Sequence, residues 1–216
     1  GAGNSQANVK GRRNHTQVDH IIYTHLHIDH TADFAPFLFA AQYAPGLQRT
    51  KDLVITGPAG IRQFYEKLKD VYGAWITPDN FSIVWTEMTK GSKEFSDFIV
   101  TAAPVKHTLS SIAVRLQDHA GKVVVYSGDT DYCRSIVDLA VHADVLILEC
   151  AFPEHMRCEG HLVPSLAGKI AQESECKKLV LTHFYPQCDT ADLLSPLRKY
   201  FSGELIIAQD LMTIRL

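Results

Sequence analysis

The chain lacks the cysteine pattern of a disulfide-rich protein or of a cysteine-based zinc site. Its five cysteines are odd in number and scattered, and none belongs to a C-x-x-C pair. A disulfide framework is therefore disfavoured, and a reducing, cytoplasmic setting is favoured. No apolar run approaches the length of a membrane span, and no charged-then-apolar leader opens the chain. We therefore expect no membrane partner.

A strong charge of either sign is also missing. The formal net charge is -3 over 216 residues, which gives no general electrostatic reason to expect nucleic-acid binding. The dense basic run Lys10–Arg13 is interpreted as a solvated loop. No repeat, low-complexity tract or Gly/Pro/Ser-rich linker marks a boundary. We therefore expect one domain over residues 1–216.

What the sequence does contain is an alternation of strand-like and helix-like segments. Helices are predicted at Thr31–Tyr43, Pro58–Tyr72, Asp131–His142, Pro164–Ser174 and Thr190–Phe201. Strands are predicted at Val18–Tyr23, Leu53–Thr56, Phe81–Thr86, Phe95–Ala103, Ile112–Gln117, Val123–Ser127, Val145–Glu149, Leu179–Thr182 and Leu205–Ala208. The segment Asp118–Gly121 is a hairpin-type connection. This pattern predicts a layered α/β domain with its sheet buried between helices.

A dense group of metal-ligand residues follows the first predicted strand. His25, His27, Asp29 and His30 lie within six consecutive positions, in what we expect to be a loop. Imidazole nitrogen and carboxylate oxygen are ligands that Zn²⁺ and similar divalent ions prefer. His25 and His27 alternate along extended backbone and would point the same way, whereas Asp29 and His30 would lie on another side of the turn. The segment predicts a metal site.

Three later strands also end in a ligand-type residue. His107, Asp129 and His183 follow the predicted strands Phe95–Ala103, Val123–Ser127 and Leu179–Thr182. Binding residues in layered α/β proteins collect at strand ends. Taken singly, each histidine also fits an ordinary packed or surface residue, and Asp129 also fits the N-cap of a helix starting near Asp131. Their repeated placement favours one shared site.

Two further residues are candidates for proton transfer. Glu149 closes a strongly apolar strand, where a buried carboxylate is costly unless it is bonded. His161 precedes the predicted helix Pro164–Ser174, and on local grounds alone it also fits a loop histidine.

Together these residues resemble the metallo-β-lactamase-fold hydrolases from about Val18 to the C-terminus, most closely the ribonuclease Z-like branch. The resemblance is carried by His25-x-His27-x-Asp29-His30, Val-Lys-His107-Thr, Tyr-Ser-Gly-Asp129-Thr, Leu-Glu149-Cys-Ala-Phe, Gly-His161 and Leu-Thr-His183-Phe. It implies an αββα sandwich and a dinuclear metal centre. The implied ligands are His25, His27 and His107 for one ion, Asp29, His30 and His183 for the other, and Asp129 between them.

The resemblance also implies a hydrolytic mechanism. A hydroxide bridging two divalent ions, zinc or alternatively manganese or iron, would attack phosphorus or a carbonyl. His161 would protonate the leaving oxygen, Glu149 would orient His161, and Asp29 would help to position the hydroxide.

Differences between this sequence and the motifs of related families disfavour several activities that occur on this fold. Asp129 replaces the usual cysteine of β-lactamases of this fold, and His27 replaces the glutamate of flavodiiron oxidoreductases. The Gly-His-Thr-x-Gly signature of glyoxalase II-type thioesterases is absent around His107. No Gly/Pro- and Lys-rich substrate arm is seen, which disfavours transfer RNA as the substrate. Gly1-Ala2-Gly3 matches the tail of a turn that follows a β-hairpin in the family, so we expect N-terminal strands of the sheet to be missing.

The sequence therefore predicts a dinuclear-metal hydrolase that cleaves a small-molecule or nucleotide phosphodiester, with a homodimer in keeping with the resembled branch. Hydrolysis of a small ester, thioester or lactone at the same site is the alternative reaction. A non-catalytic fragment or binding subunit is the alternative of a different class.

Overall fold

The computed structural model describes residues 14–216. It divides into two compact units, the first ending at Met88 and the second comprising Thr89–Leu216. The predictions for Gly1-Ala2-Gly3 and for Lys10–Arg13 lie outside the described residues. The single domain expected over residues 1–216 stays a prediction.

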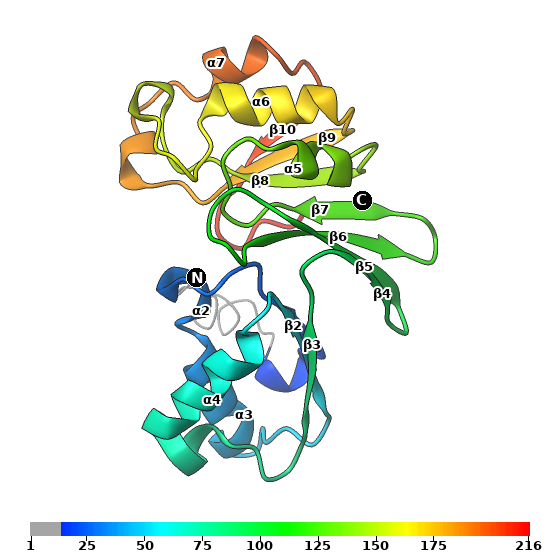
Figure 1. Ribbon diagram of the computed structural model, residues 1–216, viewed down its shortest axis with the longest axis vertical. Coiled ribbons are helices and arrows are strands. Elements are labelled where there is room, and N and C mark those ends of the chain that lie inside the picture. The colour runs from blue at the N-terminus through cyan, green and yellow to red at the C-terminus, as the bar shows by residue number, and fades with distance from the viewer. Residues whose placement is uncertain (1–13) are drawn as a thin grey trace. The chain divides into compact units, whose positions relative to one another are not determined.

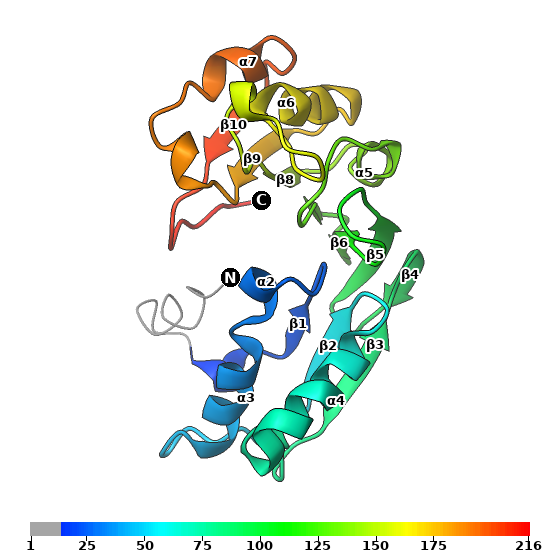
Figure 2. The same ribbon diagram turned by 60° about the vertical axis from the view of Figure 1, so that its left-hand side comes forward.

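The first unit is a parallel sheet with helices on one face (Figure 2). Its elements are η1 (His15–Gln17), β1 (His20–Ile22), α2 (Ile28–Thr31), α3 (Phe34–Tyr43), β2 (Leu53–Gly57), α4 (Ile61–Tyr72), η2 (Gly73–Ile76) and β3 (Ile83–Glu87). The strand order is β1-β2-β3, with Ile21 opposite Ile55 and Ile55 opposite Trp85. Alternate residues of β2, Leu53 and Ile55, are buried against α3 and α4 in one apolar cluster.

A buried arginine connects the residues that precede β1 and β2 through hydrogen bonds to their carbonyls. The Arg49 side chain is buried, donates from Nη1 to the Val18 carbonyl at 2.6 Å and from Nη2 to the Asp52 carbonyl at 2.7 Å, and lies over the Phe81 ring. A buried guanidinium needs such partners because its desolvation is otherwise uncompensated. The start of β1 is thereby held beside β2, and at the other end, where the histidine cluster begins, the Tyr23 amide donates to the Thr56 carbonyl at 2.8 Å.

The second unit is a mixed sheet with helices on one face (Figure 1). Its elements are β4 (Gly91–Glu94), β5 (Phe98–Pro104), β6 (Ile112–Asp118), β7 (Val123–Tyr126), α5 (Arg134–Leu139), β8 (Val145–Glu149), η3 (Glu154–Met156), α6 (Pro164–Glu173), β9 (Lys178–Thr182), η4 (Pro186–Cys188), α7 (Leu194–Arg198) and β10 (Glu204–Ile207). The order is β10-β9-β8-β7-β6-β5-β4. Residues of α5, α6 and α7 share one core cluster with β6, β7, β8 and β9.

The strand directions place the polar loops of this unit at one edge. Strands β7, β8, β9 and β10 are parallel, and β5 runs in the same direction because both β5 and β7 pair antiparallel to β6. The carboxyl ends of β5, β7, β8 and β9 therefore meet at the same edge of the sheet. Residues that follow these four ends are brought together by topology alone.

Several predicted boundaries differ from the structure. The helix predicted from Thr31 is split, because Ile28–Thr31 forms its own turn of helix that carries Asp29 and His30, so these two residues do not lie in a loop. The helix predicted from Asp131 begins at Arg134 with Cys133 as its N-cap, and the one predicted from Thr190 covers only Leu194–Arg198. The strand predicted from Phe95 begins at Phe98, because the Phe95 amide donates to the Phe98 carbonyl in a hairpin turn.

The turn at Phe95 also explains a strand that the sequence pattern did not predict. Strand β4 precedes it and pairs antiparallel with β5, although its residues Gly91–Glu94 are all exposed and show no apolar alternation. The predicted hairpin is confirmed, since Asp118–Gly121 connects the antiparallel strands β6 and β7.

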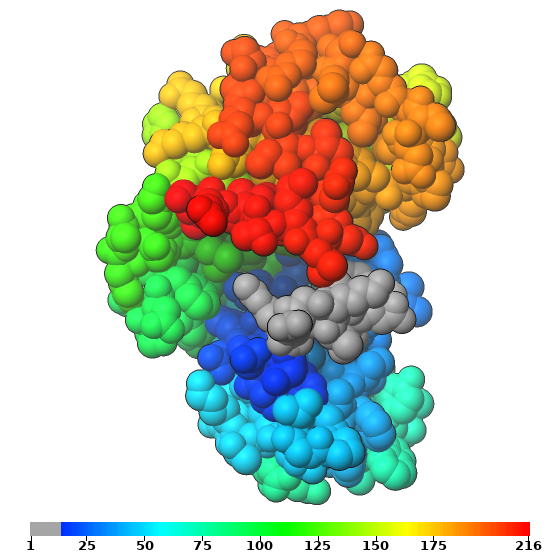
Figure 3. Space-filling model, turned by 180° about the vertical axis from the view of Figure 1, so that it is seen from behind, coloured from blue at the N-terminus to red at the C-terminus, as the bar shows by residue number. Residues whose placement is uncertain are grey.

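All five cysteines are free thiols. The segment after β10 lies on the surface of the second unit, where the Arg215 carbonyl accepts a hydrogen bond from Lys178 Nζ (Figure 3). Within residues 14–216, none of the helices has the length and apolar character needed to cross a bilayer.

Candidate metal and catalytic centre

The histidine cluster of the first unit follows the end of β1. His25 is buried, and the distance between ring centroids is 4.8 Å to His27 and 4.1 Å to His30. Thr24 Oγ1 lies 3.2 Å from His25 Nδ1, and His27 has extended backbone at the N-cap of α2. The extended backbone of His27 agrees with the predicted alternation. Asp29 Oδ2 lies 3.2 Å from His30 Nε2, so the helix turn brings the second predicted pair together.

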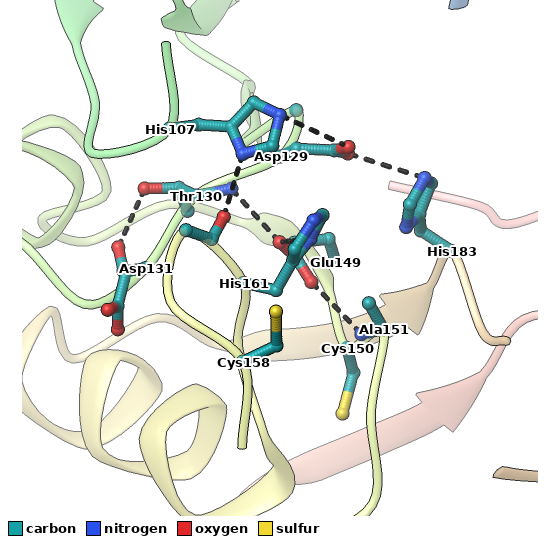
Figure 4. Close-up of polar contacts among 12 residues, drawn as sticks. His107, Asp129, Thr130, Asp131, Glu149, Cys150, Ala151, Cys158, His161 and His183 are labelled. Atoms are coloured by element: carbon teal, nitrogen blue, oxygen red, sulfur yellow. Dashed lines mark hydrogen bonds and ion pairs between the residues drawn. The ribbon is translucent and has the colours of Figure 1, made fainter. Parts of the chain in front are cut away.

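The second unit brings together three residues that follow different strands. His107, Asp129 and His183 come after β5, β7 and β9. Asp129 Oδ2 lies 3.8 Å from His107 Nε2, and Asp129 Oδ1 lies 3.5 Å from His183 Nε2 (Figure 4). One buried carboxylate thus directs its two oxygens to two different imidazoles. The alternative that Asp129 caps a helix does not hold, because Cys133 occupies that position.

A backbone carbonyl sets the orientation of His107. His107 Nδ1 lies 2.9 Å from the Gly160 carbonyl, which can only accept, so Nδ1 carries the proton and Nε2 is the nitrogen directed to Asp129. Gly160 has a φ of 85°, and a Cβ there would lie 3.1 Å from His107 Nδ1. Glycine is needed at this position for its left-handed backbone and for the close approach of the ring.

His183 has an unusual backbone conformation. Its φ is 61°, in the left-handed region that non-glycine residues seldom adopt. Such strain persists where the surrounding structure over-determines it, and it clusters at functional sites. Here it occurs immediately after β9 and directs the ring to Asp129.

Glu149 and His161 form a buried pair beside this group. Glu149 is 1% exposed, and its oxygens accept from the Thr130 amide, the Ala151 amide and His161 Nδ1, at 3.0, 3.0 and 2.9 Å (Figure 4). Three donors compensate the burial of the carboxylate. Because Glu149 accepts from Nδ1, the other ring nitrogen of His161, Nε2, is the one suited to exchange a proton with a substrate. The predicted pairing of these two residues is thus present in the second unit.

One residue that links the loops of this edge was not predicted from the sequence. Asp131 is buried, its amide donates to the Lys106 carbonyl at 2.8 Å, and its carboxylate accepts from Lys106 Nζ at 3.3 Å and from the Tyr132 amide at 2.7 Å. Arg157 Nη2 lies 3.5 Å from the same carboxylate. Burial alone raises the pKa of Asp131, but these hydrogen bonds and cations outweigh it and lower that pKa below its usual value.

Asp131 therefore joins the segments that carry His107, Asp129 and His161. Its partners are distant in sequence, so no local pattern marks it. We expect Asp131→Asn to lower the free energy of unfolding by about 1–3 kcal/mol, because hydrogen bonds to a charged group are lost. We also expect it to lower kcat/KM without loss of metal. Thermal unfolding, metal analysis and kinetics test this.

Glu159→Gln is the matched control for Asp131→Asn. Glu159 is exposed and pairs with the same Lys106 at 3.6 Å, so its loss should cost less than about 0.5 kcal/mol. Equal effects of the two variants would show that the Asp131 carboxylate contributes no more than an exposed ion pair does.

The donor set of the two clusters fits a divalent metal. Every member is an imidazole or a carboxylate. These donors suit zinc, manganese and iron, whereas a soft ion such as Cu(I) prefers sulfur ligands. The thiol nearest to Glu149 along the chain is Cys150, and burial raises its pKa well above the ordinary value. The two clusters themselves contain only nitrogen and oxygen donors, and these define the chemistry.

Comparison with known proteins places these residues in a family. The family described as Beta-lactamase superfamily domain matches residues 2–184. A probable metallo-hydrolase, YhfI of Bacillus subtilis, is 31% identical over 201 residues, covering 90% of this chain and 77% of its own. The crystal structure of YhfI, described as a metallo-β-lactamase fold protein, superimposes with a TM-score of 0.78 and covers 95% of this chain and 80% of its own, at 27% identity.

A ribonuclease is also among the relatives. Ribonuclease BN of an Enterobacter species is 26% identical over 256 residues, covering 92% of this chain and 81% of its own. The fold class predicted from the sequence, an α/β protein of the metallo-β-lactamase type, is confirmed. The chain belongs to the β-lactamase superfamily, as a metallo-β-lactamase-fold metal-dependent hydrolase of the ribonuclease Z-like branch.

Proposed function

We propose that this chain is a dinuclear-metal phosphodiesterase that cleaves a P–O bond by attack of water. The observation that carries the proposal is the geometry of Asp129, whose Oδ1 and Oδ2 are directed to His183 and His107 at 3.5 and 3.8 Å. A carboxylate can bridge two cations by directing its two oxygens to two ligand sets. Asp129 already does so within the second unit.

The proposed ligand sets follow the family resemblance. They are His25, His27 and His107 for one ion and Asp29, His30 and His183 for the other, with Asp129 shared. We propose zinc as the metal, on the basis of the nitrogen and oxygen donors. When bound, such ions would lower the pKa of a water molecule and neutralise the charge that develops on the phosphate.

The remaining roles belong to side chains. His161 is proposed to donate a proton to the leaving oxygen, while Glu149 accepts from His161 Nδ1 and holds the ring in place. Asp29 is proposed to position the attacking water. We further propose that the two units act as one domain, because the family match over residues 2–184 extends across the boundary at Met88.

A small-molecule or nucleotide phosphodiester is the proposed substrate. RNA is the second candidate, favoured by the name of the relative Ribonuclease BN. The absence from the sequence of a basic, Gly/Pro-rich insertion supports the smaller substrate.

An assay of reaction class tests the proposal. Zinc-loaded protein should hydrolyse bis(p-nitrophenyl) phosphate, lose this activity on chelation and regain it when zinc or manganese is added. Thioester and lactone substrates should react far more slowly. Turnover of only the thioester or lactone would replace phosphodiester cleavage by the alternative hydrolysis. Fewer than one bound metal per chain in the native protein would contradict catalysis altogether.

A further inference from the structure

Two aromatic side chains stand beside the candidate proton donor. Phe152 follows β8 and Tyr185 follows β9, and their ring centroids lie 5.0 Å apart with the planes inclined by 32°. We call this pair the aromatic wall. The Tyr185 amide donates to the Ala151 carbonyl at 3.1 Å, so the loops that carry the two rings are bonded to each other.

The aromatic wall meets the ring of the candidate proton donor and that of a candidate metal ligand edge-on. The Phe152 ring lies 5.7 Å from that of His161, and the Tyr185 ring lies 6.4 Å from His161 and 5.7 Å from His183. All three contacts are T-shaped, with interplanar angles of 76°, 78° and 77°. The His161 and His183 rings are nearly parallel, at 11°. The His161 and His183 rings are therefore both roughly perpendicular to the Tyr185 ring and contact the same aromatic pair.

Packing of His161 does not require both aromatic rings. Phe152 is half-buried and already gives His161 an edge-to-face contact, whereas Tyr185 keeps 40% of its surface exposed. A ring that is held by its backbone, exposed and next to a proton donor is placed to contact whatever receives the proton.

We propose that the aromatic wall binds the leaving group of the phosphodiester and that this group carries a nucleobase. The inference rests on the proposed function. A general acid must come within hydrogen-bond reach of the leaving oxygen, so the group attached to that oxygen extends past His161. Every nucleobase has a π-face that stacks on an aromatic side chain.

The chemical step is ordinary hydrolysis. The oxygen of water bonds to phosphorus, the bond from phosphorus to the leaving oxygen breaks, and its electron pair stays on that oxygen. The leaving oxygen takes a proton from His161, which is regenerated by a proton from the attacking water. The products are a phosphate monoester and a nucleoside hydroxyl, and no oxidant or reductant is needed.

Two substrates that differ only in the leaving group test the proposal. A dinucleoside monophosphate presents a base on the leaving side, whereas the methyl ester of the same nucleotide does not. Tyr185→Leu keeps an apolar side chain but removes the ring, and it should lower kcat/KM for the dinucleoside by about 10- to 100-fold. This loss should exceed the loss for the methyl ester by at least about tenfold, and Tyr185→Phe should restore the difference.

Tyr200→Leu is the control, because Tyr200 is similarly exposed at 43% but lies after α7. Equal losses on both substrates for Tyr185→Leu would overturn the proposal and assign the wall to support of His161. If the wild type cleaves neither substrate, the proposed function fails separately.

In that case the binding of free adenosine, measured by ligand-observed NMR, tests whether the aromatic wall binds a nucleobase. Weaker binding by Tyr185→Leu than by the wild type supports the proposal, and equal or absent binding overturns it.

Discussion

Replacing Asp129 by alanine is expected to remove both bound metal and hydrolytic activity. The substitution deletes the carboxylate that faces His107 and His183, and it would leave two cations without the anion between them. Metal content should fall from about two ions per chain to fewer than one, with activity at background. Inductively coupled plasma analysis of the native protein and a phosphodiester assay measure the two effects.

Two further variants make the Asp129 result specific. Asp129→Asn keeps the shape of the side chain, so a loss equal to that of alanine would assign the effect to the charge. Asp138→Ala removes an exposed aspartate of the same unit that pairs only at the surface, with Arg134 at 2.7 Å, and should keep metal and activity. Full metal content in Asp129→Ala would rule out the bridging role.

His161→Ala is expected to slow turnover while leaving the metal in place. A lost general acid costs about 10²- to 10⁴-fold in rate, and most for a leaving oxygen of high pKa. The loss should therefore be smaller for p-nitrophenyl esters than for a dinucleoside monophosphate. Kinetics on both substrates, together with metal analysis, test this assignment.

Glu149→Gln extends the same prediction. Glutamine can still accept a hydrogen bond from one amide, but it lacks the negative charge that strengthens the hydrogen bond from His161 Nδ1. A partial loss in kcat is therefore expected. His155→Ala, an exposed histidine in η3, is the control. If His161→Ala released metal, or if it left the rate unchanged, the proton donor would have to be another group.

The sequence predicted the parts of this site that depend on strand ends. His107, Asp129 and His183 were selected because each follows an apolar strand, and the shared edge of β5, β7 and β9 brings them together. Glu149 was selected because a buried carboxylate needs partners, and the structure supplies three donors. Strand periodicity and the cost of burial are local properties, so a single sequence reveals them.

The parts that were missed depend on contacts between distant residues. Asp131 binds Lys106 and Arg157, which are 25 and 26 positions away, and nothing in its own segment indicates this. The aromatic wall arises because two loops after neighbouring strands are bonded together. Strand β4 is polar and exposed, so its pairing with β5 decides its conformation rather than its own pattern.

The position of the Gly160 carbonyl limits the insertions and deletions that the loop before His161 can accept. This carbonyl orients His107, and the next residue in the chain is His161. An insertion or deletion in residues 157–160 would displace a proposed metal ligand and the proposed proton donor in the same event. Substitution of the Tyr185 side chain leaves the backbone that holds His183 in place, so it would alter the proposed leaving-group site without displacing a proposed metal ligand.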